Sequence, residues 1–427
     1  MSQEATFEDL VAFRRDLHRH PEPAWREFYT TARIVDELET RDLDALYVGP
    51  EILDAADRMA VPDDDELDEW VERARAAGAR EDVLERLAGG MTGAVAVLER
   101  GEGPTVGLRV DIDALPITES GDDDHLPAAE EFRSENEGYM HACGHDAHAT
   151  IGLGVLDAVA ASDFEGTFKV FFQPSEEMIA GGKAMVNGGH LDDVDYLLAV
   201  HVGLDHPTGE VVCGVDGFLA VSHFRADFRG EPAHAGAKPE EGNNANLAAA
   251  TAIQNLYGIS RHSDGATRVN VGVMGGGTAT NIVAEESFIE GEVRGATTEL
   301  MEYMEDRAHT VIESAAAMHD CETEISVEGR APSARSDEVL RTIVGAVSEG
   351  VDGVESILDT DDLGGSEDAT YLMQHVQDQG GLAAYVGVGT DHPGGHHTGT
   401  FDVDEATIRI AIDVLSGSAT RIATEQP

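Results

Sequence analysis

The densest group of reactive residues in the sequence is the segment HACGHDAH at positions 141–148. It places Cys143, His145, Asp146 and His148 within a few residues of one another. Thiolate and imidazole groups are ligands that a borderline-soft divalent ion such as zinc prefers. The chain has only three cysteines, so we interpret this cluster as metal-binding rather than structural.

Two neighbouring glutamates, Glu176 and Glu177, follow the apolar run FFQP. Adjacent carboxylates repel each other unless a cation or a proton lies between them. One of the two can therefore bind a metal ion while its neighbour acts as a general base toward water. A pair of solvated surface acids is the alternative interpretation, because acidic residues are abundant throughout this chain.

Three further segments carry candidate ligands. Asp111 and Asp113 end the alternating run RVDID, and His201 directly follows the apolar run LLAV. His396 and His397 lie in a glycine-rich loop. Taken singly, the aspartates fit surface acids and His201 fits a buried histidine. Taken together with the cysteine and the glutamate pair, they form a ligand set for two metal ions, which at a separation of about 3.5–4 Å share a hydroxide and polarise a carbonyl.

These clusters follow apolar runs that predict strands. The candidate strands are residues 94–98, 105–112, 167–172, 196–200 and 383–388. Helical segments lie before and between them, at 6–41, 63–87 and 149–162, and a final helix is expected at 405–423. This alternation predicts an α/β fold with a mainly parallel sheet. Such sheets bind ligands beyond the carboxyl ends of their strands, where the clusters lie.

Between residues 216 and 328 the pattern changes to strand, helix, strand, strand, helix, strand. The order βαββαβ is that of a ferredoxin-like unit. We therefore expect a catalytic domain formed by residues 1–215 and 329–427, with the ferredoxin-like domain of residues 216–328 inserted into it.

The charge balance of the chain is extreme, with 28 Lys and Arg against 83 Asp and Glu and a net charge of −55. The acids are spread along a sequence that keeps a globular apolar fraction of 41%, so a disordered acidic tail is excluded. Nucleic acid is excluded as a partner because clustered cations are absent. No segment has the length and apolarity of a membrane span, and the N-terminal residues lack the layout of a secretory signal, so we expect a cytoplasmic protein.

At these motifs the sequence resembles the amidohydrolase branch of the di-metal aminoacylase and carboxypeptidase family. The motifs that carry the resemblance are LHRHPEPAWREF, RVDIDALP, MHACGHDAH, FFQPSEE, HFRADFRGEPAHAGAKPEEGNNA, GGGTATNIV, GGSEDATYLM and GHHTGTFDVDE, which span nearly the whole chain. The acidic insert around residues 51–67 is most similar to that of the p-aminobenzoyl-glutamate hydrolases. The resemblance implies a metallopeptidase-like catalytic domain and a ferredoxin-like lid or dimerisation domain.

The resemblance also implies roles for individual residues. The implied metal ligands are Cys143, His145, Glu177, His201 and His397, which would bind two divalent ions, manganese or alternatively zinc. Glu176 would be the general base, and Asp113 would be a carboxylate that orients a ligand or the base. In the wider family a histidine stands where this chain has Asp111 and a bridging aspartate stands where it has Cys143. His397 is chosen over His396 because it lies four residues before Phe401, as the ligand of the branch does.

In the inserted domain the resemblance assigns catalytic and binding roles to three residues. His234 would stabilise the oxyanion of the tetrahedral intermediate, and Asn281 and Arg294 would hold the substrate carboxylate. Their alternative interpretations are a surface loop, a turn and a cation at a strand end. The implied assembly is a homodimer, and a requirement for a second kind of subunit stays open.

The expected function is hydrolysis of the amide bond of a small N-acyl amino acid, with p-aminobenzoyl-glutamate or a similar aroyl- or acyl-amino acid as substrate. A broad-range aminoacylase or dipeptidase is the alternative within the enzyme class. A catalytically silent protein that binds metal or ligand is the alternative outside it, and the presence of Glu176 argues against that alternative.

The net charge indicates a halophilic protein and generates the first prediction. Lowering the salt from molar to millimolar concentration should lower the melting temperature and inactivate the protein, because carboxylate repulsion is screened over only about 3 Å in 1 M salt and over much longer distances in dilute buffer. Thermal melting across a salt series measures this. A melting temperature that stays flat would show that the charge has another cause.

Overall fold

The computed structural model describes residues 3–392 and 394–427, which form two compact units. Among the described residues, the first unit consists of 3–217, 334–363, 368–392 and 394–427. The second consists of residues 218–333 together with the short segment 364–367. No helix of the described chain has the combination of length and apolar character that crossing a membrane requires.

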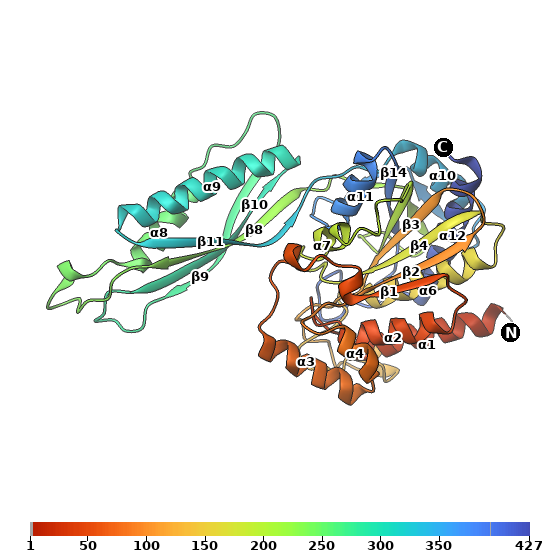
Figure 1. Ribbon diagram of the computed structural model, residues 1–427, viewed down its shortest axis with the longest axis horizontal. Coiled ribbons are helices and arrows are strands. Elements are labelled where there is room, and N and C mark those ends of the chain that lie inside the picture. The colour runs from red at the N-terminus through yellow and green to blue at the C-terminus, as the bar shows by residue number, and fades with distance from the viewer. Residues whose placement is uncertain (1–2, 393) are drawn as a thin grey trace. The chain divides into compact units, whose positions relative to one another are not determined.

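The first unit is built on an eight-stranded sheet with the order β1-β2-β4-β3-β5-β14-β6-β12. Figure 1 shows β1, β2, β4 and β3 side by side in this sheet. The strands are β1 (Ala45–Val48), β2 (Ala94–Arg100), β3 (Thr105–Asp111), β4 (Gly166–Gln173), β5 (Tyr196–Val202), β6 (Glu210–Val212), β12 (Ser356–Leu358) and β14 (Leu382–Val388). The four central strands β4, β3, β5 and β14 are parallel, whereas β2 runs antiparallel to β4. The predicted α/β fold with a mainly parallel sheet is thus confirmed. A separate parallel pair joins β7 (Val215–Asp216) to β13 (Asp361–Asp362).

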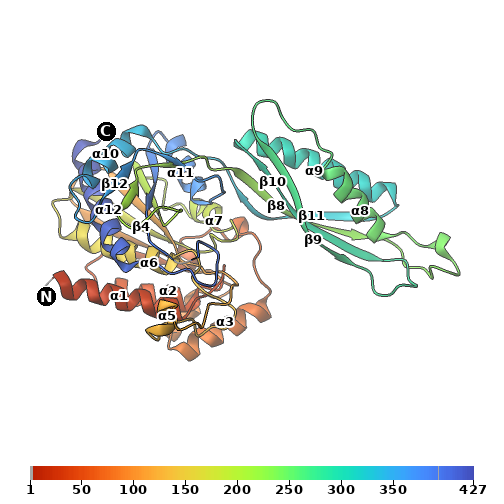
Figure 2. The same ribbon diagram turned by 180° about the vertical axis from the view of Figure 1, so that it is seen from behind.

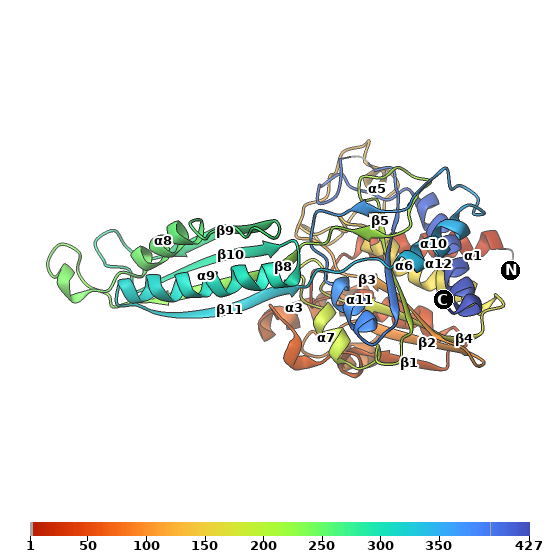
Figure 3. The ribbon, with the colours of Figure 1, turned by 90° about the horizontal axis from the view of Figure 1, so that it is seen from above.

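Helices cover the faces of this sheet. They are α1 (Gln3–Arg19), α2 (Phe28–Glu39), α3 (Asp64–Ala77), α4 (Glu81–Arg86), α5 (Leu126–Ala129), α6 (His145–Ala160), α7 (Gly182–Asn187), α10 (Glu338–Ser348), α11 (Ala369–Asp378) and α12 (Glu405–Glu425). Helix α6 packs against α1, α12 and β3, whereas α11 packs against α7 and β14 (Figure 3). The expected helical stretch at 6–41 is two helices rather than one, because two prolines, Pro21 and Pro23, interrupt it.

Helix α6 begins four residues earlier than the apolar pattern predicted, so that His145 lies in its first turn. Gly144 precedes it in the left-handed region at φ 86°. A Cβ atom at this position would lie 2.7 Å from a methyl group of Val202, so the start of the helix can approach β5 closely only with glycine. The polar segment that we interpret as a ligand cluster is therefore also the first turn of a buried helix.

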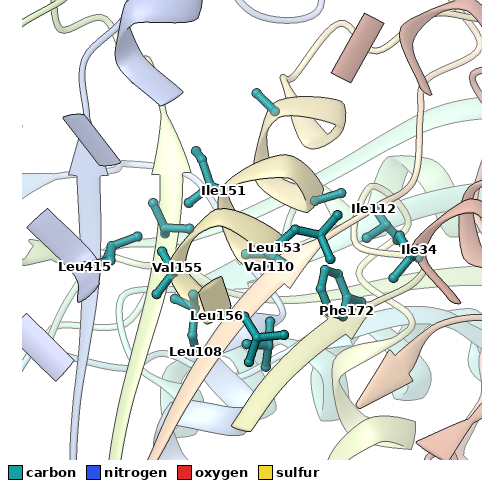
Figure 4. Close-up of a cluster of buried hydrophobic side chains, with 14 of the residues drawn as sticks. Ile34, Leu108, Val110, Ile112, Ile151, Leu153, Val155, Leu156, Phe172 and Leu415 are labelled. Carbon is teal, nitrogen blue, oxygen red and sulfur yellow. The ribbon is translucent and has the colours of Figure 1, made fainter. Parts of the chain in front are cut away.

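The core of the first unit forms where α6 lies over the sheet (Figure 4). Ile151, Leu153 and Val155 of the helix are buried in the same hydrophobic cluster as Leu108 of β3 and Phe172 of β4. Nearly every α6 side chain is buried, in agreement with a helix covered on more than one side.

The second unit has the element order β8 (Ala220–Arg229), α8 (Ala245–Leu256), β9 (Thr267–Gly276), β10 (Glu286–Gly295), α9 (Thr298–Met318) and β11 (Glu322–Ala331) (Figure 2). Its sheet has the order β11-β8-β10-β9, and every neighbouring pair is antiparallel. Buried residues alternate along β8, and they share a core with the inner faces of α8 and α9. Side chains of Asn244 and Thr297 cap the two helices by accepting backbone N–H groups.

The packing of α6 generates the second prediction. Leu153→Ala should lower the free energy of unfolding by about 2–5 kcal/mol, because it leaves a cavity in the core of the first unit. Val339→Ala is the matched control, since Val339 is 44% exposed on α10. Denaturant unfolding in molar salt measures both variants, and equal losses would contradict the core position of Leu153.

Candidate active site

Side chains from the carboxyl ends of β3, β4 and β5 and from the start of α6 meet in one buried cluster. Three overlapping groups have candidate ligand atoms that all lie within 4.8 Å of one another. These groups are Cys143 with His145 and His201, His145 with Glu176 and Glu177, and Cys143 with Glu177 and His397. All five residues expected to bind metal are thus brought together, with Glu176 beside them.

His201 is held in the orientation of a metal ligand. Its Nδ1 donates to the carbonyl of Val202 at 2.7 Å, which leaves the Nε2 lone pair facing the Cys143 Sγ at 3.4 Å. Burial lowers the pKa of His201 well below its ordinary value, so the ring is neutral. A neutral ring with one nitrogen fixed by a carbonyl is the usual form of a ligating histidine.

His145 is surrounded by carboxylates. Its Nδ1 lies 3.3 Å from Asp113, and its Nε2 lies 3.5 Å from Asp111 and 3.7 Å from Glu177. Burial opposes a charge on the ring, but the negative charges of Asp111 and its neighbours outweigh burial and raise the pKa of His145 to about 10. Its Nε2 has no hydrogen-bond partner among the described residues. The cluster therefore needs positive charge, which divalent ions supply.

His148, which the sequence also placed in this cluster, has both ring nitrogens occupied. Its Nδ1 contacts Asp111, and its Nε2 accepts the backbone N–H of Val202 at 2.9 Å. Arg109 donates to the same Asp111 carboxylate at 2.6 Å. Burial alone would raise the pKa of Asp111, but His145, Arg109 and His148 hold it well below its usual range. His148 and Asp111 thus tie α6 to β3 and β5.

The loop after β4 presents Glu176 and Glu177. The backbone N–H groups of Glu176 and Glu177 donate to the two oxygens of Asp113, at 3.1 and 3.0 Å. Asp113 is 1% exposed, so the two bonds form away from water. This geometry gives Asp113 an orienting contact with the segment that bears both glutamates.

The glycine-rich loop supplies two histidines with different surroundings. His397 lies with its Nε2 3.5 Å from Glu177 and is exposed. His396 accepts the backbone N–H of Leu204 at its Nε2, at 3.0 Å, so its ring proton must be on Nδ1. That N–H points to Cys143 Sγ at 3.6 Å. His396 therefore has no lone pair to give a metal ion, whereas His397 does.

The donor set fits two divalent ions. Cys143, His145 and Glu177 each belong to two of these three groups. The thiolate and the carboxylate could be shared by two ions, whereas His145 would give only its Nε2, because its Nδ1 faces Asp113. Thiolate, imidazole and carboxylate donors are all present, and the histidine that faces the cysteine is neutral. The residues that the structure assembles are thus consistent with the expected pair of metal ions.

A second buried polar cluster fixes the first turn of α6. Arg14 of α1 lies with its Nε 2.7 Å from Asp146, and His18 bridges Asp146 and Glu119 at 2.9 Å on each side. Burial opposes the charge on His18, but bonds to Asp146 and Glu119 raise its pKa to about 9. Since Asp146 follows His145 directly, this network holds the turn that carries a candidate ligand.

The three candidate residues of the second unit are not together. A backbone bridge joins His234 to Ile282, next to Asn281, in the loops that follow β8 and precede β10. Arg294 lies near the opposite end of β10, where it donates to both oxygens of Glu292 at 2.9 Å. The stretch of β10 from residue 286 to residue 294 is roughly 25 Å long. Within one chain, Asn281 and Arg294 therefore cannot hold the same carboxylate.

Sequence reasoning missed several residues that support the site. Asp368 accepts backbone N–H groups of Gly181 and Gly182 and the side-chain amide of Gln173. Glu27 accepts the N–H of Ser175. No spacing rule identifies these acids, because their partners are backbone groups far away in the sequence.

Comparison with known proteins places the chain in a family. The model of the peptidase family M20/M25/M40 matches residues 107–421. The chain belongs to this family. It is therefore a hydrolase, as the sequence analysis expected.

Two curated relatives match over nearly the full length. The indole-3-acetyl-aspartic acid hydrolase of Enterobacter agglomerans is 43% identical over 415 residues, covering 96% of this chain and 95% of the relative. A p-aminobenzoyl-glutamate hydrolase subunit of Escherichia coli (strain K12) is 42% identical over 414 residues, with the same coverage. The crystal structure of the aminobenzoyl-glutamate utilization protein from Klebsiella pneumoniae is similar with a TM-score of 0.84, 37% identity and coverage of 98% and 97%. The family expected from the motifs is confirmed.

Proposed function

We propose that this hydrolase cleaves the amide bond of a small N-acyl amino acid, with p-aminobenzoyl-glutamate or a similar aroyl- or acyl-amino acid as substrate. The observation that carries the proposal is the position of Glu176 beside the assembled ligand set, with its backbone fixed by Asp113. The two curated relatives support the substrate class, because both are named for hydrolysis of an acyl group linked to an acidic amino acid.

Cys143, His145, Glu177, His201 and His397 would hold two divalent ions per chain. Manganese is the metal we propose, because carboxylate and imidazole donors suit it, and zinc is the alternative that the Cys143 thiolate favours. Such ions, when bound, polarise the amide carbonyl and make water more acidic.

Glu176 is the proposed general base. It takes a proton from the attacking water and then passes that proton to the leaving amine as the amide bond breaks. Asp113 acts through the backbone, since its two oxygens hold the N–H groups of Glu176 and Glu177. The carboxylate of Glu176 is thereby kept within the cluster through both proton transfers.

The second unit would supply groups for the oxyanion and for the substrate carboxylate. The Nδ1 of His234 accepts the N–H groups of Gly236 and Ala237, so the ring proton is on Nε2, from which it could donate to an oxyanion. Because Arg294 lies at the other end of β10 from His234 and Asn281, we propose a homodimer in which one chain supplies Arg294 and its partner supplies the other two. The second unit would then act as lid and dimerisation domain.

The activity is tested by a substrate screen of the purified protein in molar salt with added manganese or zinc. p-Aminobenzoyl-glutamate and indole-3-acetyl-aspartate should have the highest kcat/KM. Faster turnover of N-acetyl amino acids or dipeptides would instead show a broad-range aminoacylase or dipeptidase. No turnover of any amide, with metal bound, would show a silent binding protein.

The third prediction separates metal binding from catalysis. Cys143→Ala should lose metal and activity together, because it removes a donor from two overlapping groups. Glu176→Gln should keep metal and lower kcat by at least about 10² fold, because the base is lost. Elemental analysis and kinetics measure both variants.

His396→Gln is the control for this comparison. It should keep full metal content, whereas His397→Gln should lose metal, because only the latter ring has a lone pair directed away from the backbone. Metal loss in the His396 variant and none in the His397 variant would reverse their roles.

The fourth prediction concerns the second unit. His234→Ala should lower kcat by about 10² to 10³ fold, as the loss of an oxyanion donor does. Arg294→Ala should mainly raise KM, because it removes binding present in both ground and transition states. Both variants should keep their metal and fold, and wild-type kinetics in both would remove the second unit from the site.

Mixing the two variants tests the homodimer. In a mixed dimer one of the two sites receives an intact Arg294 from one chain and an intact His234 from its partner. Random mixing should therefore restore about a quarter of wild-type activity. No restoration, with subunit exchange verified, would mean that both residues act within one chain.

A further inference from the structure

We propose that Glu27 is a positioning residue for the general base: its buried carboxyl group holds the backbone of Ser175 in the conformation that directs Glu176 into the site. The inference rests on the proposed function of Glu176 and extends it to a residue far away in the sequence. Glu27 acts through Ser175.

The loop after β4 is held by buried carboxyl groups rather than by secondary structure. The N–H of Ser175 donates to Glu27 at 2.8 Å, and the next two N–H groups donate to Asp113. Farther along, Gly181 and Gly182 donate to Asp368 at 3.0 and 2.7 Å. Each of these acids belongs to another segment of the first unit, so hydrogen bonds to three other segments fix the course of the loop.

Ser175 has a backbone conformation that needs such support. Its φ is 61°, in the left-handed region that a residue with a side chain adopts at a cost in free energy. Its carbonyl accepts the N–H groups of Ala180 and Gly181, so the loop turns back on itself at this point. If the Ser175 N–H lost its acceptor, this residue could relax, and the adjacent Glu176 would move with it.

Glu27 is itself rigidly held. Its other carboxyl oxygen accepts the hydroxyl of Thr92 at 2.7 Å, and both side chains are completely buried. The residue precedes α2, but its side chain does not cap that helix. It has no ion pair with any described Lys, Arg or His, so only hydrogen bonds offset the free-energy cost of burying its carboxyl group. Burial, followed by the charge of Asp113, raises the pKa of Glu27 to about 8.

A buried carboxyl group without an ion pair costs free energy, and an apolar residue would fill the same volume without that cost. The specific gain from Glu27 is an acceptor placed at the residue before the general base. A glutamine would provide the same acceptor through its amide oxygen, and its NH₂ group could donate to Thr92. Leucine would fill the space without providing any acceptor.

These differences define the experiment. Glu27→Leu should lower kcat about 10² fold, as a small misplacement of a catalytic group does, with metal content unchanged and KM within about threefold of wild type. Glu27→Gln should restore kcat to within about threefold of wild type. Thr92→Val is the matched control, because it removes the other hydrogen bond of Glu27 but leaves Ser175 its acceptor. The kcat of Thr92→Val should stay within about threefold of wild type.

Hydrogen exchange of the backbone amides gives a readout independent of turnover. The Ser175, Glu176 and Glu177 amides should exchange faster in Glu27→Leu and keep their protection in Glu27→Gln. If the leucine variant does not fold, Glu27→Asp replaces it, because the shorter side chain withdraws the acceptor from Ser175 while a carboxyl group remains. Its kcat should also fall.

The outcomes separate the two proposals. Wild-type kcat and protection in both Glu27→Leu and Glu27→Asp would overturn the positioning role while leaving Glu176 as the base. A loss of metal or melting temperature with no fall in kcat per metal-loaded enzyme would also overturn it. Failure of the wild type to hydrolyse any amide would remove the proposed function, while the exchange data would still decide whether Glu27 holds the loop.

Discussion

Buried carboxyl groups that accept backbone N–H groups are the constraint on which the site depends. The loop bearing Glu176 and Glu177 has no regular structure of its own, and Glu27, Asp113 and Asp368 occupy its donors. These three acids are almost completely buried in the first unit. A catalytic residue can lie on a loop because buried side chains of the core accept hydrogen bonds from the backbone of that loop.

The sequence was sufficient for the parts of the site whose residue types are chemically distinctive. Cysteine occurs only three times in this chain, and the histidines near Cys143 and at the end of an apolar run made Cys143, His145 and His201 candidate ligands. Glu27 and Asp368 could not be found in this way. They lie in the motifs LHRHPEPAWREF and GGSEDATYLM, but among 83 acidic residues their type alone does not mark them as acceptors of distant backbone N–H groups.

The fold was likewise predictable in some parts and not in others. Long apolar runs predicted the central strands and the βαββαβ order, whereas the short strands β6 and β12 escaped notice because three residues carry too little pattern. The start of α6 was placed too late, since its first turn is made largely of polar residues, which are buried against polar partners from other segments, as His148 is against Asp111 and Asp146 against Arg14. Asn281 precedes β10 and Arg294 lies near the end of this strand, so their separation follows from the length of the strand between them.

In the proposed homodimer, the separation of these two residues has a consequence for the living cell. If the partner chain completes the active site, the rate per chain depends on protein concentration. The reason is that dissociation on dilution leaves each active site without the residue that the partner supplies. Below the dissociation constant the output would rise with the square of expression level. The length of β10 would then make activity depend on dimerisation. At expression levels too low for dimers to form, the protein would have little activity.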